Sequence, residues 1–442
     1  MEHIKRHIDD IREEIISIGE QIYREPETGF KEFKTAKLVT EKFKQMGLNT
    51  VSIKEYPGVK ATIDTGRKGP GLAVVAEMDS VICPAHPDAD SKTGAVHACG
   101  HNAQIAAMLG TAMGIIASGI IDRLSGKLHF IAVPAEEYIE IGYRKQLKDK
   151  GIIKYLGGKP ELLRKGFFDD VDMCISVHAS VKGEKDISIK NSANGCIVKN
   201  IKYIGKASHA GGSPHLGVNA LYAASLGLMA INSLRETFVE DEYIRVHPII
   251  TKGGEIVNAI PDEVIIETYV RGSNIEAIKA ASKKVDRAIA GSAYAMGAKV
   301  IIENLPGYMP LHNDPALITI GREVAAGLVG IENYYEGGHA KGSTDWGDIS
   351  SLMPIMETSV SGFSGTGHGA DYVIEDPEKA YVLPAKYLAL LSIELLGNKA
   401  KRAEEILIAF KPVFNSKEEY FRAADEFFKT KHSCEIELLC DI

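Results

Sequence analysis

The chain has 442 residues, of which 45% are hydrophobic and 25% are charged, and its formal net charge is −8. This composition is typical of a folded, water-soluble protein of about two or three domains, and it excludes the disordered and fibrous classes. Because charges of both signs are interspersed and no run of about 18 apolar residues is present, we expect neither a nucleic-acid nor a membrane partner.

The N-terminal segment predicts an amphipathic helix and not a secretory signal. Its isoleucines recur at spacings of three and four from Ile4 to Ile22, which places them on one helical face, and Pro26 ends the helix. Charged residues interrupt the segment throughout, so it lacks the apolar core of a signal sequence. The six cysteines of the chain are sparse and irregularly spaced, which argues against a disulfide framework. We therefore expect a reduced, cytoplasmic protein.

Short apolar runs then alternate with helical stretches. Gly71–Met78, Lys127–Val133 and Asp172–His178 are predicted to be buried strands, and Ala103–Ser118, which lies between the first two, favours a helix. This alternation indicates the α/β class, with a mostly parallel sheet flanked by helices.

The pattern changes near residue 189, where alternating strands and two longer helices predict a smaller α+β layer. We predict a second domain over residues 189–303, inserted into a catalytic domain made of residues 1–188 and 304–442. The segment 416–431 predicts an amphipathic helix that begins at a capping serine.

The strongest local signal is the sequence His97-Ala98-Cys99-Gly100-His101. A thiolate and an imidazole two residues apart can converge on one metal ion. The motif opens the helix that follows the first predicted strand, and ligands of open α/β sheets gather at the carboxyl ends of strands. The position favours metal ligation by Cys99 and His101, with simple packing as the alternative.

Two further candidates lie at comparable positions. Glu136 and Glu137 follow the second predicted strand directly, and His178 ends the third. Each alone would be an ordinary polar residue at a strand end. Together with Cys99 and His101 they form a set suited to Zn²⁺ or another borderline transition metal, with one glutamate left free to act as a general base.

A fifth candidate ligand lies in the glycine-rich segment Ser361–Gly369, which contains His368. The alternative is a flexible turn with an incidental histidine. The segment has no lysine and no GxxxxGK[ST] pattern, so a nucleotide site is not expected.

Taken together, these motifs resemble the dinuclear metal amidohydrolases, a family that includes aminoacylases, hippurate hydrolases, indole-acetyl-amino-acid hydrolases and aminobenzoyl-glutamate hydrolases. The resemblance extends from the segment IYREPETGFKEFKTA to the segment SGTGH and the helix after it. It implies a catalytic α/β domain interrupted by a smaller lid domain through which two subunits form a homodimer. Asn102 and the stretches PHLGVNAL, RVHPIITKGG and GSTDWGDIS are closest to the aminobenzoyl-glutamate hydrolase branch.

The resemblance also implies roles in the catalytic domain. It implies two divalent transition-metal ions (Zn, Mn, Co or Ni), with Cys99 as the bridge between them. Glu136 matches the general base, and Asp79, in AEMDS, matches an aspartate that orients the centre. Five residues match the metal ligands, and they are Cys99, His101, Glu137, His178 and His368.

In the lid, the resemblance implies three more functional residues. His209, in GKASHA, matches a histidine that stabilises the oxyanion of the tetrahedral intermediate, and the family's lid can present it across the dimer interface. Asn258 and Arg271 match positions that hold the substrate carboxylate, for which an arginine fork is well suited. By its sequence context alone, Arg271 is an ordinary surface charge at a strand end.

The chain departs from the family pattern at two places. Many relatives have a glycine run after the paired glutamates, whereas here a longer, charged connection runs from Tyr138 to Phe168 and could reshape the pocket. Gln104 replaces a histidine that is common in relatives, and the sequence assigns it no role.

The predicted activity is metal-dependent hydrolysis of the amide bond of an N-acyl or N-aroyl amino acid. One alternative is a dipeptidase or aminopeptidase acting on short peptides, which would need an acidic anchor for the free amine. A third interpretation is a catalytically inactive metal-binding dimer. A fourth is a purely structural metal site, although such a site would saturate its ligands and leave no free base.

Overall fold

The computed structural model describes residues 2–181 and 185–432, and the chain divides into two compact units. Unit 1 consists of Met1–Ser192, His312–His339 and Asp348–Val413, and unit 2 consists of Ala193–Leu311, Ala340–Gly347 and Phe414–Ile442. Short elements lie where the chain passes from one unit to the other, namely β9 (Ser192–Ala193), β15 (Leu311–His312), β17 (His339–Ala340) and α10 (Trp346–Ser350).

Unit 1 contains, among the described residues, a nine-stranded sheet in the order β1-β2-β6-β3-β7-β18-β8-β16, with β19 paired to β18. Its centre, β6-β3-β7-β18, is parallel, and antiparallel strands extend it. This confirms the predicted α/β class. The strands are β1 (Thr50–Ser52), β2 (Val59–Asp64), β3 (Gly71–Glu77), β6 (Lys127–Val133), β7 (Met173–Val181), β8 (Ile187–Ile189), β16 (Tyr334–Glu336), β18 (Ile355–Ser364) and β19 (Val373–Ile374), besides the separate pair β4 (Val81–Ile82) and β5 (Ala95–Val96).

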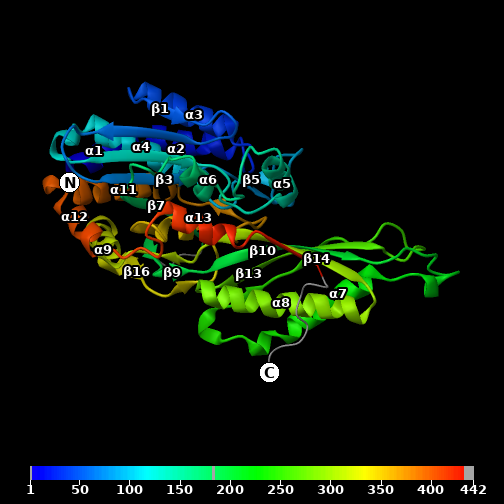
Figure 1. Cartoon of the computed structure of the whole chain (residues 1–442). Coiled ribbons are helices and arrows are strands. Elements are labelled where there is room, and N and C mark those ends of the chain that lie inside the picture. The colour runs from blue at the N-terminus through cyan, green and yellow to red at the C-terminus, as the bar shows by residue number, and fades with distance from the viewer. Residues whose placement is uncertain (1, 182–184, 433–442) are drawn as a thin grey trace. The chain divides into compact units, whose positions relative to one another are not determined.

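Helix α4 (His101–Ala117) is the central helix of unit 1. It packs against β3, β7, α2 and α11 (Figure 1), and its side chains are buried around nearly the whole circumference, because it is apolar on all sides. The predicted N-terminal helix is divided into α1 and α2 at Ile11. The other helices are α1 (Glu2–Asp10), α2 (Arg12–Tyr23), α3 (Phe33–Gln45), α5 (Ile141–Asp149), α6 (Gly158–Arg164), α9 (Pro315–Val329), α11 (Leu383–Leu396) and α12 (Lys401–Ala409).

The helices differ from membrane spans in length and composition. No single helix of the described residues is long and apolar enough to cross a bilayer. One bent pair, Glu378–Leu396 with Asn398–Ala409, reaches the required length and hydropathy only when its two helices are taken together.

Unit 2 is an antiparallel sheet in the order β11-β13-β10-β14-β20, with β12 on the same edge as β11. Residues of β13 alternate between buried and half-buried, and α7 and α8 pack side by side against the sheet (Figure 1). The elements are β10 (Gly195–Ile204), α7 (Ala220–Ser233), β11 (Arg245–Val246), β12 (Ile249–Lys252), β13 (Glu263–Gly272), α8 (Ile275–Ala295), β14 (Lys299–Tyr308), α13 (Lys417–Asp425) and β20 (Lys429–His432).

The structure places the unit boundaries at other positions than the predicted residues 189 and 303. Strand β14 continues without a break to Tyr308, so unit 2 reaches Leu311. The described residues from Phe414 to His432 also belong to unit 2, whereas the prediction placed them in the catalytic domain. The physical reason is that β20 pairs with the edge of β14, where Lys431 forms an ion pair with the buried Asp286 at 2.7 Å.

The predicted helix over residues 416–431 is present only in its first part. The Ser416 hydroxyl accepts the backbone N–H of Glu419 and caps α13, as expected. The helix ends at Asp425, and after a short turn the chain forms β20 from Lys429, because the open edge of β14 offers backbone partners that a helix would not use.

Candidate metal centre

The carboxyl ends of adjacent parallel strands bring the predicted residues of unit 1 together. β6, β3 and β7 are neighbours, so the segments that follow them meet at one edge of the sheet. Glu136 and Glu137 follow β6, and the turn before α4 carries Cys99. His178 lies within β7, which continues to Val181, and not at the strand end as predicted.

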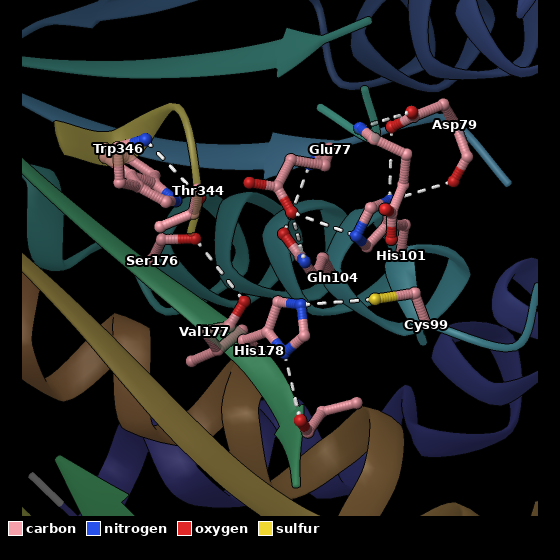
Figure 2. A network of polar contacts seen from close by, with 12 residues as sticks. Glu77, Asp79, Cys99, His101, Gln104, Ser176, Val177, His178, Thr344 and Trp346 are labelled. Atoms are coloured by element: carbon pink, nitrogen blue, oxygen red, sulfur yellow. Dashed lines mark hydrogen bonds and ion pairs between the residues drawn. The ribbon is translucent and has the colours of Figure 1, made fainter. Parts of the chain in front are cut away.

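Cys99, His101 and His178 form one group whose potential ligand atoms all lie within 4.8 Å of one another. The Sγ atom of Cys99 is 3.5 Å from Nε2 of His178 (Figure 2). The turn that joins Cys99 to His101 depends on Gly100, whose φ of 79° is left-handed and whose Cβ, if present, would lie 2.5 Å from Cβ of Ala179. The local chain therefore places the thiol and the imidazole on the same side of the turn.

Cys99 also belongs to a second group, with Glu137 and His368. Nε2 of His368 lies 3.3 Å from Sγ of Cys99 and 2.9 Å from Oε1 of Glu137. The backbone N–H of His368 donates to the carbonyl of Ala98, which ties the glycine-rich segment to the motif. One thiol shared by two ligand groups fits the expected bridging position.

Asp79 forms hydrogen bonds with one residue of each of the two groups. Its backbone carbonyl is 2.9 Å and its Oδ1 3.2 Å from Nδ1 of His101, while its Oδ2 accepts the backbone N–H of Glu137. The carbonyl can only accept, so Nδ1 of His101 carries the proton and Nε2 is free to bind a metal. The side chain of Asp79 is fully buried, and its contacts fix the orientation of the His101 ring.

Glu136 lies in a third group, with His101 and with Glu77, a residue that no sequence motif singled out. Glu77 is the last residue of β3 and is fully buried. Its signal in the sequence is a carboxylate at the carboxyl end of an otherwise apolar strand. The family motif in the same segment matches Asp79 instead, so Glu77 was not singled out. Glu77 lies beside Gln104 and His101 in the network of Figure 2.

The protonation of the cluster indicates that its residues fit a cation. Hydrogen bonds to Cys99 and Glu137 raise the pKa of His368 to about 11. Burial lowers the pKa of His178, but Cys99 outweighs this effect and raises it to about 10. Burial and Glu137 raise the pKa of Cys99, but His101 and His178 outweigh them and lower it to about 6. Protons therefore supply the positive charge that a divalent ion would supply instead.

The donor set is that of a transition-metal site. Thiolate and imidazole ligands with one carboxylate suit Zn²⁺ and its neighbours in the first transition row. The buried Nε2 of His101 makes no regular hydrogen bond within the described part of the chain and faces the carboxylate of Glu77 at 3.2 Å, a position in which a metal ion would bind both.

The three predicted lid residues lie in unit 2. His209 is exposed, and its Nδ1 accepts the backbone N–H groups of Gly211 and Gly212, which leaves its Nε2–H as a donor. The carbonyl of Asn258 accepts the N–H of Ala210, so Asn258 and His209 lie on neighbouring segments. This arrangement suits a hydrogen-bond donor for an oxyanion.

Arg271 is the third lid residue, and it lies in a cluster of positive charge. It lies near the end of β13 beside Arg245 of β11, with its guanidinium 5.4 Å from the ring centre of Tyr269. Burial lowers the pKa of His247, and Arg235, Arg271 and Arg245 lower it further. A cluster with this charge suits an anion with several carboxylate oxygens.

Comparison with known proteins points to one family. The sequence model of peptidase family M20/M25/M40 matches residues 73–392. The chain is similar to hippurate hydrolase of Campylobacter jejuni, with 28% identity over 88% of this chain and 98% of that protein.

Two solved structures share the fold. A Bacillus subtilis protein described as a dinuclear metal-binding peptidase of family M20 superposes with a TM-score of 0.64 at 22% identity, over 88% of this chain and 99% of that one. An aminobenzoyl-glutamate utilization protein from Klebsiella pneumoniae superposes with a TM-score of 0.67 at 18% identity, over 90% and 99% of the two chains.

The lowered pKa of Cys99 predicts a reactive thiol in metal-free protein. Since the thiolate fraction falls as the pH drops through about 6, the rate of alkylation by iodoacetamide at Cys99 should fall roughly tenfold from pH 7 to pH 5. Zn²⁺ should protect the thiol. Peptide mass spectrometry measures both effects, with Cys174, whose pKa burial raises, as the unreactive control. Equal alkylation with and without Zn²⁺ would contradict metal ligation by Cys99.

Proposed function

Because the chain belongs to peptidase family M20/M25/M40, a family of metal-dependent hydrolases, we propose that it cleaves the amide bond of an N-acyl or N-aroyl amino acid. The observation that carries the proposal is the convergence of Cys99, Glu137 and His368 with His101 and His178 around one shared thiol. Glu136 lies beside this set as a further carboxylate.

The proposed chemistry assigns the proton transfers to Glu136. Two divalent ions, when bound by the five ligands, would polarise the scissile carbonyl and make water more acidic. Glu136 takes a proton from the attacking water and returns it to the leaving amine. Only 7% of its surface is exposed, so a proton that it takes up is passed on to the leaving amine more readily than it is lost to solvent. Asp79 holds the imidazole of His101 in the ligating orientation.

The lid would supply substrate recognition. His209, with Nε2–H as the free donor, stabilises the oxyanion that develops on the carbonyl. Arg271 and Asn258 hold the carboxylate of the amino-acid portion. The nearby Arg245 and Arg235 favour an amino acid with more than one carboxylate, which agrees with an aminobenzoyl-glutamate-like substrate.

We further propose that two chains associate through unit 2. On α7 the apolar side chains of Tyr222, Leu226 and Met229 are exposed at spacings of three and four, and the edge strand β12 exposes Ile249 and Ile250. An exposed apolar helix face beside a sheet edge favours self-association. We also propose that the protein works in a reducing compartment such as the cytoplasm, because Cys99 must remain a thiolate to bind a metal ion.

Replacing Glu136 tests the proposed general base. Glu136→Gln should lower kcat by roughly two orders of magnitude or more, since general-base catalysis contributes about that much. The metal content should stay near that of the wild type, as measured by elemental analysis. The substrates are a panel of N-acyl amino acids, with dipeptides as the comparison. Near-full activity of the variant would refute the assignment, and faster turnover of dipeptides would favour the peptidase alternative.

Replacing Arg271 tests carboxylate recognition. Arg271→Met should raise KM for an N-acyl amino acid roughly 10- to 100-fold and change kcat little, because it removes binding that is shared by ground and transition states. The control variant is Arg287→Met on α8. For an N-acyl amine without a carboxylate, the KM of the variant should equal that of the wild type. An unchanged KM would exclude this role.

Charges on the apolar surface of unit 2 test the dimer. Met229→Asp combined with Ile249→Asp should convert the dimer to a monomer. The α7 face and the β12 edge, which dimer formation would bury, would then each carry a charge. Light scattering after size-exclusion chromatography measures the mass. Tyr294→Asp, at an exposed site of α8, is the control. A wild-type protein that is monomeric at micromolar concentration would refute the proposal.

A further inference from the structure

Glu77 is a fully buried carboxylate with two fixed oxygen positions. Its Oε1 accepts from Nζ of Lys159, and its Oε2 accepts from Nε2 of Gln104 at 2.7 Å. The backbone N–H of Glu77 in turn donates to Oε1 of Gln104. These contacts hold the carboxylate in one orientation, with Oε2 facing the cluster (Figure 2).

The separation between Oε2 of Glu77 and the nearest atom of His101 is close to that of two ligand atoms bound to the same metal ion. Oε2 of Glu77 is 3.2 Å from Nε2 of His101. Two ligands bound tetrahedrally to Zn²⁺ at about 2.0 to 2.1 Å are roughly 3.3 to 3.4 Å apart. For a sulfur at about 2.3 Å and a nitrogen the separation is about 3.6 Å, and Sγ of Cys99 is 3.5 Å from Nε2 of His178.

The chemistry of the pair calls for a cation. Nδ1 of His101 donates to the carbonyl of Asp79, so Nε2 is the ring nitrogen that faces the carboxylate of Glu77. Two buried acceptors that face each other at 3.2 Å are unfavourable unless a proton or a metal ion lies between them.

We propose that Glu77 is a further ligand of the metal ion that His101 binds, since the two residues share a ligand group, and that Lys159 is the positioning residue that holds its carboxylate in place. This inference rests on the proposed metal-dependent function and deepens it. It adds one oxygen to the five expected ligands, and it gives a role to the long connection between Tyr138 and Phe168.

That connection is fastened to the metal centre at several points. Lys159 lies on α6 and is fully buried, so its charge requires the partner that Glu77 provides. Next to it, the N–H of Gly158 donates to the carbonyl of Ala135, and a Cβ on Gly158 would overlap the carbonyl oxygen of Pro134. Helix α6 therefore lies directly against the segment that leads to Glu136.

Helix α5 contributes a second fastening. The fully buried Arg144 donates to the carbonyl of Leu156 at 2.6 Å and to that of Glu137, one of the expected ligands. Two buried cations of the long connection, Lys159 and Arg144, thus contact Glu77 and Glu137 of the metal centre directly.

The test compares three variants, Glu77→Gln, Lys159→Met and the double variant, with Lys165→Met as an exposed control on the same segment. Zn²⁺ affinity is measured by competition with a chelator, and coordination by the visible spectrum of the Co²⁺-substituted protein. Thermal unfolding of the metal-free forms reports on folding. The single variants break the buried ion pair and should be less stable, whereas the double variant removes both charges.

If Glu77 is a ligand, the double variant regains thermal stability but binds one Zn²⁺ at least roughly 10- to 100-fold more weakly and has an altered Co²⁺ spectrum. Lys159→Met alone should weaken binding, and Lys159→Arg should recover part of the loss. A double variant with wild-type Zn²⁺ affinity and spectrum would overturn the proposal, because the pair would then be structural only.

The outcome is separable from that of the proposed function. Wild-type protein that binds Zn²⁺, loses affinity on Glu77→Gln and cleaves no amide would refute the proposed function alone. Wild-type protein that cleaves N-acyl amino acids while Glu77→Gln keeps full affinity would refute the ligand role alone. Wild-type protein that binds neither Zn²⁺ nor Co²⁺ would refute both.

Discussion

The structure of unit 1 depends on one electrostatic constraint, which is the burial of a thiol, imidazoles and carboxylates at the carboxyl edge of a parallel sheet. Cys99, Glu77 and Glu137, each with a lowered pKa, contribute negative charge; Glu77 and Cys99 are buried and Glu137 is largely so. Such groups are stable only when positive charge accompanies them. Protons on the histidines provide that charge in the protein alone, and the donor set indicates that divalent metal ions provide it in the working enzyme.

Much of the surrounding structure serves this constraint. Asp79 fixes the tautomer of His101 and holds the backbone of Glu137, while Gln104 and Lys159 hold the two oxygens of Glu77. Gln104, to which the sequence assigned no role, therefore belongs to the support of the centre. The same is true of the long connection after Glu137, for which the sequence offered only that it could reshape the pocket. What the structure shows of it is a set of buried contacts behind the ligands.

Unit 2 provides a different kind of chemistry. It contains no such buried ligand cluster among its described residues, but it gathers exposed donors. His209 is held with Nε2–H free, and Arg271 lies with Arg245 and Arg235 near His247. Under the proposed function unit 2 recognises the substrate, and its separation from the charged centre allows recognition to vary while the centre remains the same.

Local features of the sequence were enough to predict the α/β class, three central strands and the family, because apolar runs, glycine turns and ligand motifs are each contained in a short stretch of chain. The predicted strand Lys127–Val133 has its observed bounds, and the other two strands nearly so. Which polar residues meet is a property of the folded chain alone. Glu77 and Lys159 are 82 positions apart, and no periodicity or motif records such a contact. The conversion of the chain's tail into β20 had the same cause, since its partner, the open edge of β14, exists only in the folded protein.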